Sequence, residues 1–323
     1  MKYKYYIFNN DIDYFKVMFA DIVDDDNVEY IGDPSKYYNF GNIKKKLYDW
    51  HYSPYLNYFF NIPFKYLWNR EIFKNNNDLR PKCFVFLMGW LVNSREPFFK
   101  FLKRKYKDCK LVLYFEDLVS SRSSLNLGLI DKYFDLVLTY DKGDADKFHF
   151  VYCPTFLSKI SGVSSKGNIF DVCFVGAAKN RYDCVMNLYQ YLTSKGLKCD
   201  FTVAFLQENQ IKIQGVNYID NQMSYIEYLQ HVLNSRCILE IQQDGAVGFT
   251  LRTWEALLYG KKMITNNKSI LKADFYSPSQ FLYFSTLEDI DVKFVREENC
   301  FDTESYKGIL SPINFLNIIE NNI

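Results

Sequence analysis

The stretch Gly248 to Asn267 reads GFTLRTWEALLYGKKMITNN and places the residue types that an anion requires at the start of one expected helix. Thr250 stands where it would cap a helix over residues 251–258. The N–H groups of the first turn, beginning with Leu251, are then free to bind an anion. The Thr250 hydroxyl and the Arg252 guanidinium add two further donors, so the stretch predicts a phosphate-binding helix start.

Glu255 follows one turn later in the same expected helix. If phosphates bind at the helix start, its carboxylate is within reach of a ribose diol. The alternative is an ordinary capped helix, in which Leu251, Ala256 and Leu257 enter the core and Glu255 is solvated. The spacing alone leaves both interpretations open.

A second glycine turn lies in FVGAAKNRYD, residues 174–183, where an apolar run ends at Gly176 and Lys179 and Arg181 follow. Glycine permits close backbone approach, and two cations can neutralise a diphosphate. Solvated surface residues are the simpler interpretation of the same pattern. The two turns together suggest one diphosphate site.

Short β-branched or aromatic runs alternate with helical patterns along the chain, which is typical of parallel sheets covered by helices. We therefore expect an α/β fold with two Rossmann-like doubly wound domains facing a cleft. The segment SKISGVSSKGN is rich in Ser, Gly and Lys and indicates a linker. The expected domains are residues 1–157 and 169–323, joined by the linker 158–168. The expected strands are 5–8, 28–31, 83–88, 111–115, 136–139 and 148–152, then 171–175, 200–204, 217–219, 237–241, 263–265 and 281–283.

Composition excludes some partners and places the chain in a reducing compartment. The 323 residues carry 39 Lys and Arg against 38 Asp and Glu, so no global field attracts nucleic acid. The eight cysteines form no CxxC pair and several lie in apolar runs, as expected in a reducing cytosol. The N-terminus turns polar too early for a signal peptide, and no apolar run is long enough to span a membrane. We expect a cytoplasmic protein that lies at most on the inner face of the plasma membrane.

The stretch 36–74 combines many aromatic residues with lysines and has hardly any acid. This combination suits the headgroup zone of a membrane, where aromatic rings lie at the boundary and lysines contact anionic lipid. An aromatic-rich helical pair packed on the first sheet is the competing interpretation.

The quoted glycine turns, together with MSYIEYLQHVLNSRCILEI and the earlier YDKGDADKFHFVYCP, resemble GT-B fold glycosyltransferases of bacterial capsule and lipopolysaccharide assembly. The resemblance covers roughly residues 136–267. It implies transfer of a sugar from a nucleotide-activated donor, with UDP as the expected carrier, bound mainly by the domain 169–323, to an acceptor held by the domain 1–157. The acceptor is a glycan or is lipid-linked, and one carried on polyprenyl would be reached at a membrane through the stretch 36–74. No cofactor and no metal are implied beyond the nucleotide sugar itself.

The resemblance also implies roles for individual residues. Gly176 and Arg181 would line the donor diphosphate, Thr250 and Arg252 would hold its far end, and Glu255 would bind the ribose. Retaining relatives carry an acid eight positions before the residue that corresponds to Glu255. This chain has Val247 at that position, and the nearest acid is Asp244. We therefore expect inversion at the sugar carbon.

Inversion requires a general base that takes the proton of the acceptor hydroxyl. Asp117 follows an apolar strand, Asp33 follows another, and His51 has an imidazole that titrates near neutral pH. Each also has a structural interpretation, as a turn cap or a packed residue. A non-catalytic GT-B-like protein that binds a glycan or a partner remains the alternative to an enzyme, whereas a dehydrogenase is disfavoured because no strand is followed by GxGxxG and a later acid.

Overall fold

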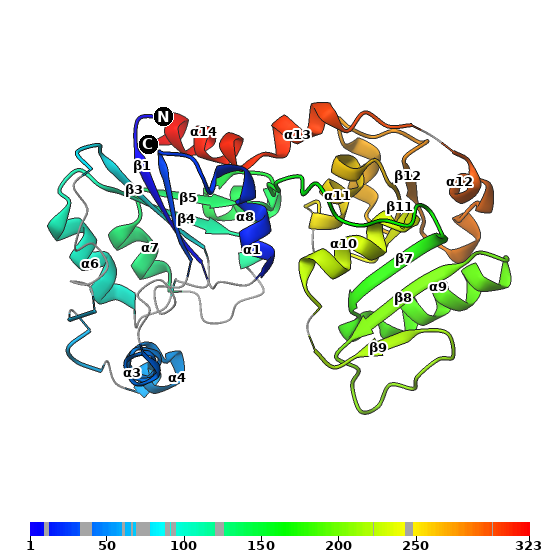
Figure 1. The fold of residues 1–323 in the computed structure, drawn as a ribbon, viewed down its shortest axis with the longest axis horizontal. Helices are drawn as coiled ribbons and strands as arrows, with labels where there is room; N and C mark the ends of the chain where they lie inside the picture. Colours follow the sequence, from blue (N-terminus) through cyan, green and yellow to red (C-terminus); the bar gives the residue numbers. More distant parts are fainter. Residues whose placement is uncertain are drawn as a thin grey trace. The chain divides into compact units, whose positions relative to one another are not determined.

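The computed structural model divides into two compact units, each built on one sheet (Figure 1). Unit 1 comprises Met1–Pro154 together with Pro312–Ile323, and unit 2 comprises Thr155–Ser311. Each unit holds a six-stranded sheet whose pairings are all parallel and which helices flank, so the expected α/β class with two doubly wound domains is confirmed. The structure describes residues 1–9, 13–32, 41–59, 62–65, 67–68, 78–87, 91, 95–119, 126–221, 223–242, 248–298 and 300–323.

The sheet of unit 1 has the strand order β2-β1-β3-β4-β5-β6. Its strands are β1 (Lys4–Phe8), β2 (Val28–Gly32), β3 (Lys82–Leu87), β4 (Lys110–Phe115), β5 (Leu136–Thr139) and β6 (Val151–Tyr152). Its helices include α1 (Asp13–Met18), α3 (Asn42–Tyr52), α4 (Pro54–Phe59), α6 (Glu96–Lys105), α7 (Leu127–Tyr133), α8 (Lys142–Phe148) and α14 (Pro312–Asn322), with a short 3₁₀ turn at Ala20–Ile22. The strand expected over 148–152 is shorter than predicted, because α8 continues to Phe148 and leaves only two residues for β6.

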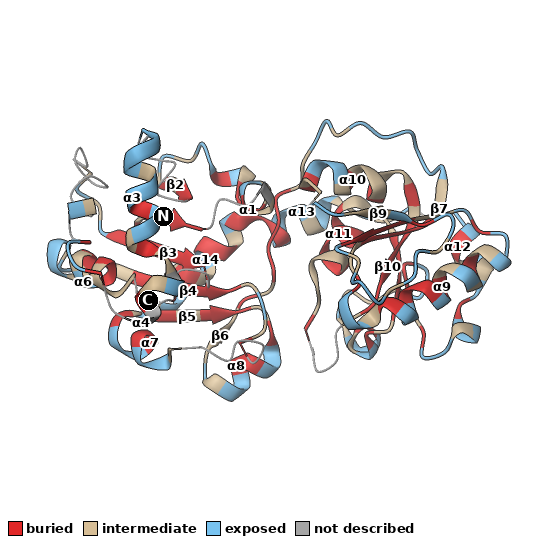
Figure 2. Cartoon of the chain, turned by 90° about the horizontal axis from the view of Figure 1, so that it is seen from below, coloured by how far each residue is buried: buried red, intermediate tan, exposed pale blue. Residues whose placement is uncertain are grey.

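Aromatic rings fill the core of unit 1, and strands β3 and β4 are buried along nearly their whole length (Figure 2). Phe8 of β1 stacks on Phe86 of β3 with ring centroids 4.8 Å apart, and Phe98 of α6 meets the Phe8 ring edge-on at 5.5 Å. Strands buried on both faces read as continuous apolar runs, which explains why this sheet was visible in the sequence.

The last helix, α14, belongs to unit 1 although the sequence placed it in the second domain. Phe315 packs edge-on against Tyr114 of β4 at 5.3 Å and against Phe19 at 6.3 Å. Glu320 Oε1 accepts hydrogen bonds from the Lys2 backbone N–H at 2.6 Å and from the Tyr5 hydroxyl at 3.1 Å. The domain boundary expected at 169–323 therefore differs from unit 2 in its last residues, because the apolar face of α14 covers the sheet of unit 1.

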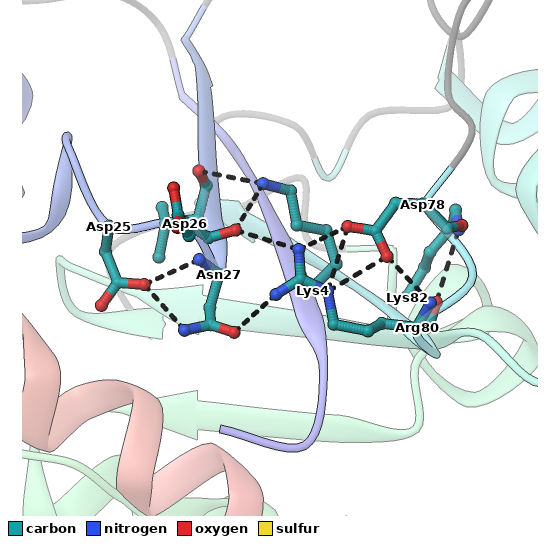
Figure 3. A network of polar contacts seen from close by, with 8 residues as sticks. Lys4, Asp25, Asp26, Asn27, Asp78, Arg80 and Lys82 are labelled. Carbon is teal, nitrogen blue, oxygen red and sulfur yellow. Dashed lines mark hydrogen bonds and ion pairs between the residues drawn. The ribbon is translucent and has the colours of Figure 1, made fainter.

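The acid-rich turn 24–27 is joined to the beginning of the first sheet (Figure 3). Arg80 donates to Asn27 Oδ1 at 2.7 Å and pairs with Asp78. Lys4 Nζ, at the start of β1, donates to the Asp26 carbonyl at 2.9 Å. These contacts lie where β1, β2 and β3 begin, at the edge opposite the carboxyl ends at which ligands bind in such sheets.

Unit 2 repeats the design with the strand order β12-β11-β10-β7-β8-β9. Its strands are β7 (Phe170–Ala177), β8 (Cys199–Ala204), β9 (Asn217–Ile219), β10 (Ser235–Glu240), β11 (Lys262–Thr265) and β12 (Phe281–Tyr283). If the strands are numbered along the chain with β7 as the first, their order from the β9 edge is 3-2-1-4-5-6. This is the strand order of dinucleotide-binding domains. The order reverses between β7 and β10, so that this junction is the topological switch point.

The helices of unit 2 follow strands β7, β9, β10 and β12 along the chain. They are α9 (Tyr182–Ser194), α10 (Tyr225–Leu233), α11 (Leu251–Tyr259), α12 (Val292–Arg296) and α13 (Glu304–Leu310), with 3₁₀ turns at Lys179–Arg181, Lys268–Lys272 and Leu287–Asp289. A capping box joins Ser224 and Glu227 at the start of α10.

The segment expected as a linker, 158–168, contains no helix or strand and is bonded to unit 2. The Ile160 backbone N–H donates a hydrogen bond to the Tyr259 hydroxyl oxygen at 3.0 Å. Just before the segment, the Leu157 N–H donates to the Leu310 carbonyl at 2.7 Å. The two stretches that connect the units therefore run side by side.

Candidate functional site

Two arginines cross the switch point of unit 2 in opposite directions. Arg181, in the turn after β7, donates from Nη1 to the Ile241 carbonyl beyond the end of β10, and from Nη2 to the Ala177 carbonyl at 3.1 Å. Arg252, in the helix that follows β10, donates from Nη2 to the Val175 carbonyl in β7. The sequence predicted a shared site for these two side chains, and the structure brings both to the carboxyl ends of β7 and β10.

Neither arginine has a carboxylate partner within ion-pair distance in the described part of unit 2, because both are held by neutral backbone carbonyls. Burial and the nearby Arg252 charge lower the pKa of Arg181. Arg252 Nε is buried and has no hydrogen-bond partner among the described residues. Two cations that repel each other and lack a counter-ion favour the binding of an anion.

Gly176 ends the apolar part of β7 and lies against Arg252. Its φ of 151° belongs to a region that residues with a side chain rarely adopt. Lys179 is exposed and also has a positive φ, of 51°, while its carbonyl accepts a hydrogen bond from Gln210 Nε2 at 3.2 Å. Gly176 is therefore part of the two-arginine arrangement, whereas the Lys179 ammonium lies on the surface.

Thr250 caps α11, as its position in the sequence suggested. Its hydroxyl oxygen accepts from the Arg252 N–H at 3.2 Å, and its own proton goes to Glu240 Oε1. The second oxygen of Glu240 accepts from the Thr265 hydroxyl at 2.6 Å. Glu240 was not predicted from the sequence; the only signal is an acid as the last residue of an apolar strand.

Leu251 and Gly248 flank the cap. Leu251 is the first residue of α11 and is half-buried. Gly248 is buried, and its carbonyl accepts from Gln242 Nε2 at 2.7 Å and Asn267 Nδ2 at 3.1 Å, which fixes the backbone just before the helix. Asp244 and Val247, on which the expectation of inversion depends, lie outside the described residues.

Glu255 lies inside unit 2 rather than in the open site. The residue is 0% exposed, Oε1 accepts from the Tyr225 hydroxyl at 2.8 Å, and Oε2 accepts from the Tyr228 hydroxyl. Burial raises the pKa of Glu255 to about 7, and the two tyrosine hydrogen bonds and Arg252 partly oppose this rise. A ribose cannot reach this carboxylate in the observed conformation, so the expected ribose contact is not part of the site described here. Both tyrosines face it because they are one turn apart on α10.

Of the three candidate bases of the first domain, the structure describes Asp117 and His51, and no hydrogen bond joins these two. Asp117 is exposed just after β4, and its Oδ1 accepts from the Leu118 N–H at 2.9 Å. His51 lies in α3, where Nδ1 accepts from Trp68 Nε1 at 2.8 Å, and burial together with Lys65 lowers its pKa. Its neutral ring then carries the proton on Nε2, so neither nitrogen is free to accept another. Asp33 lies outside the described residues.

The stretch 36–74 includes the two helices α3 and α4. Tyr48, Tyr52 and Trp68 form a small cluster of their own. Arg95 stacks on the Tyr52 ring at 4.1 Å. Within the described ranges, no helix combines the length and apolar character needed to cross a bilayer, and no group of three or more His, Cys, Asp or Glu side chains is placed to hold a metal ion.

No family model matches the chain, and no curated protein matches it. Among solved structures, it is similar to the glycosylation-associated protein (Gap123) complex from Streptococcus agalactiae, with 10% identity and a TM-score of 0.43 over 80% of this chain and 56% of that one. It is also similar to accessory secretory protein 1, 2 and 3 in Streptococcus pneumoniae, with 10% identity and a TM-score of 0.42 over 79% and 56%. A third is an alpha-glucosyltransferase in complex with UDP and a mismatched 13-mer DNA, with 12% identity and a TM-score of 0.42 over 72% of each chain. This chain spans little more than half the length of the first two.

Proposed function

We propose that the protein is a GT-B glycosyltransferase that moves a sugar from a UDP-sugar to a glycan or lipid-linked acceptor in surface polysaccharide assembly, with inversion and without a metal. The observation that carries the proposal is the pair Arg181 and Arg252 at the switch point of unit 2. A parallel sheet binds ligands in the crevice beyond its strand ends at this point. Two guanidiniums without carboxylate partners in the described part of the chain supply the charge that a diphosphate requires.

In this scheme the acceptor hydroxyl attacks the anomeric carbon, the bond from that carbon to the diphosphate oxygen breaks, and UDP leaves with the bonding electron pair. Arg181 and Arg252 stabilise the negative charge that develops on the diphosphate. The proton of the acceptor hydroxyl passes to a base of unit 1. Asp117 is the preferred base because it is exposed at a strand end, whereas the Nδ1 atom of His51 is already occupied by Trp68.

The proposed acceptor is lipid-linked, and α3 offers a surface for the membrane in which it lies. Ile43, Leu47 and Trp50 are exposed at i, i+4 and i+7, so they form one apolar stripe along the helix. Lys44 and Lys46 lie beside the stripe and are exposed. An apolar stripe flanked by lysines fits the interface of an anionic bilayer.

Titration calorimetry with UDP-glucose and other UDP-sugars tests the proposal directly. We expect binding by the wild type, and we expect Arg252→Ala to weaken it by about 10- to 100-fold, because one charge-assisted hydrogen bond contributes roughly 1.5–3 kcal/mol. Arg296→Ala is the matched control, since Arg296 also donates to a backbone carbonyl of unit 2, that of Gly196 at 3.2 Å, and is not part of the two-arginine site. No binding of any nucleoside diphosphate or its sugar at millimolar concentration overturns the proposal.

The second candidate is a non-catalytic GT-B-like protein that binds a glycan or a partner. It is favoured by one observation, the burial of Glu255, which removes the ribose acceptor that the resemblance implied. The two candidates separate in a turnover assay: an enzyme slowly hydrolyses or transfers the sugar of the UDP-sugar that it binds, whereas a binding protein leaves that donor intact.

A further inference from the structure

Glu255 is a buried acid that the proposed reaction does not use. Both of its oxygens are hydrogen-bonded to tyrosine hydroxyls of α10, and it lies three residues after Arg252 in α11. An acid with this degree of burial is normally paired with a cation, yet no ion pair joins Glu255 to Arg252 within the described residues. The Arg252 guanidinium is instead bonded to β7, at Val175.

The two groups nevertheless act on each other through their charges. The positive charge of Arg252 lowers the pKa of Glu255 and also that of Tyr228, although burial raises both overall. The groups that face this acid are Tyr225 and Tyr228 from α10 and Arg252 from its own helix; Tyr259 of α11 and Cys173 of β7 act on the two tyrosines. Arg252 is the only cation among these described neighbours.

We propose that Glu255 is a positioning residue for the anion site, which acts through Arg252 by taking up a proton when an anion binds there. This inference rests on the proposed function, because it requires that the ligand's negative charge lie at Arg252. When Glu255 is ionised, its negative charge reduces the positive potential that Arg252 presents to the ligand. When Glu255 is protonated, it does not reduce this potential. The tyrosine hydroxyls can remain bonded in both states, since a carboxyl oxygen still accepts while its O–H donates to a tyrosine oxygen.

The sign of the effect follows from linkage. A bound anion offsets the Arg252 charge, which had favoured the ionised form of Glu255, so the pKa of this acid rises and the protein takes up a proton near neutral pH. Affinity for the anion must then fall as pH rises through about 7, the pKa of the free site. If the anion raises that pKa by one unit, affinity is about tenfold weaker well above this pH than well below it.

Calorimetry with UDP-glucose, whose diphosphate diester does not titrate between pH 5 and 9, tests the inference. Titrations at pH 7 in two buffers of different ionisation enthalpy give the number of protons taken up, and inorganic sulfate serves as a second probe without a nucleoside. We expect the wild type to take up a fraction of a proton and to lose about tenfold in affinity from pH 5.5 to 8.5. Glu255→Gln should abolish the uptake and flatten the pH profile, with affinity close to that of the wild type at low pH.

Tyr228→Phe separates this role from a merely structural one. It removes a hydrogen bond that lowers the pKa of Glu255, so the midpoint of the affinity profile should move to higher pH. Glu227→Gln is the control, since it removes an exposed carboxylate of α10 and should leave the uptake unchanged. UDP-glucose binding with no proton uptake, or with uptake that persists in Glu255→Gln, overturns this inference and leaves the proposed function standing. Absence of binding by both probes overturns the two together.

Discussion

A side chain at residue 176 would collide with Arg252. A Cβ atom built on Gly176 would lie 2.7 Å from Arg252 Nη2, closer than such atoms approach in proteins. The guanidinium therefore occupies the space that a larger residue would fill, on its way to the Val175 carbonyl. Gly176 was expected to let a phosphate approach the backbone. It also leaves room for the Arg252 guanidinium, which is proposed to bind that phosphate.

Gly176→Ala should displace Arg252 and weaken UDP-glucose binding by about tenfold or more, the effect of losing one charge-assisted contact. The strained backbone should also cost about 1–3 kcal/mol of stability. Calorimetry and urea unfolding measure the two effects. Gly162→Ala is the matched control, because Gly162 also has a positive φ, of 79°, but nothing lies within 4 Å of the added atom. Unchanged affinity in Gly176→Ala would show that the position of Arg252 against residue 176 does not affect UDP-glucose binding.

Asp117→Asn should lower the rate of sugar transfer by about 10²–10⁴-fold, the usual effect of removing a general base. UDP-glucose affinity should stay within about twofold of the wild type, because a base acts on the acceptor and not on donor binding. Steady-state turnover and calorimetry on the same preparation check both expectations. Transfer at the wild-type rate would exclude Asp117 and leave Asp33 as the next candidate.

His51→Gln is the companion variant and should keep its turnover. The glutamine oxygen can still accept from Trp68 Nε1, whose bond to His51 Nδ1 is the structural role that the residue has here. A rate loss in this variant alone would mean that His51 gives up the tryptophan bond during the reaction and is itself the base.

Combined replacement of Ile43, Leu47 and Trp50 by serine should reduce binding to vesicles that contain phosphatidylserine, since the stripe supplies the apolar contact. Lys44→Gln with Lys46→Gln should reduce binding as well, by about 1 kcal/mol for each lysine at low salt. Vesicle sedimentation measures both. Leu79→Ser, at a position that is 99% exposed in unit 1, is the control for general loss of apolar surface. Sedimentation that is independent of lipid charge would favour a role for α3 other than membrane contact.

His231 should make the stability of unit 2 depend on pH. Its Nδ1 lies 2.6 Å from Asp200 Oδ2, and this hydrogen bond raises the pKa of His231 above its usual value of about 6.5. The contribution of the pair is therefore complete below that usual value and is lost as pH rises through the folded pKa. Urea unfolding of wild type and Asp200→Asn should differ by on the order of 1 kcal/mol at pH 5.5 and by less at pH 9. An equal difference at both pH values would contradict this account.

The sequence predicted the sheets because buried parallel strands form short apolar runs between polar turns. β12 has the expected bounds, and Thr250 caps α11 as its position suggested. The prediction that was wrong depends on contacts between segments that are distant in the sequence. The helix α14 was assigned to the wrong unit, because no local pattern indicates which sheet its apolar face covers.

The same distinction holds for the candidate site. Arg181 and Arg252 could be found because the first lies in the turn that follows β7 and the second in the first turn of the helix that follows β10. Glu240 and the tyrosine partners of Glu255 could not, because each hydrogen bond joins elements that are separated in the chain. Periodicity placed Glu255 on the helix but could not tell whether α10 would cover that face.

The return of α14 to unit 1 fixes the order in which the protein can be completed during synthesis. The chain leaves unit 1 at Pro154 and comes back only at Pro312, so that the whole of unit 2 is an insertion within unit 1. Until α14 has been synthesised, Tyr114 and Phe19 lack the ring of Phe315 that packs against them. Unit 1 can therefore acquire the helix α14 only after the whole of unit 2 has been synthesised.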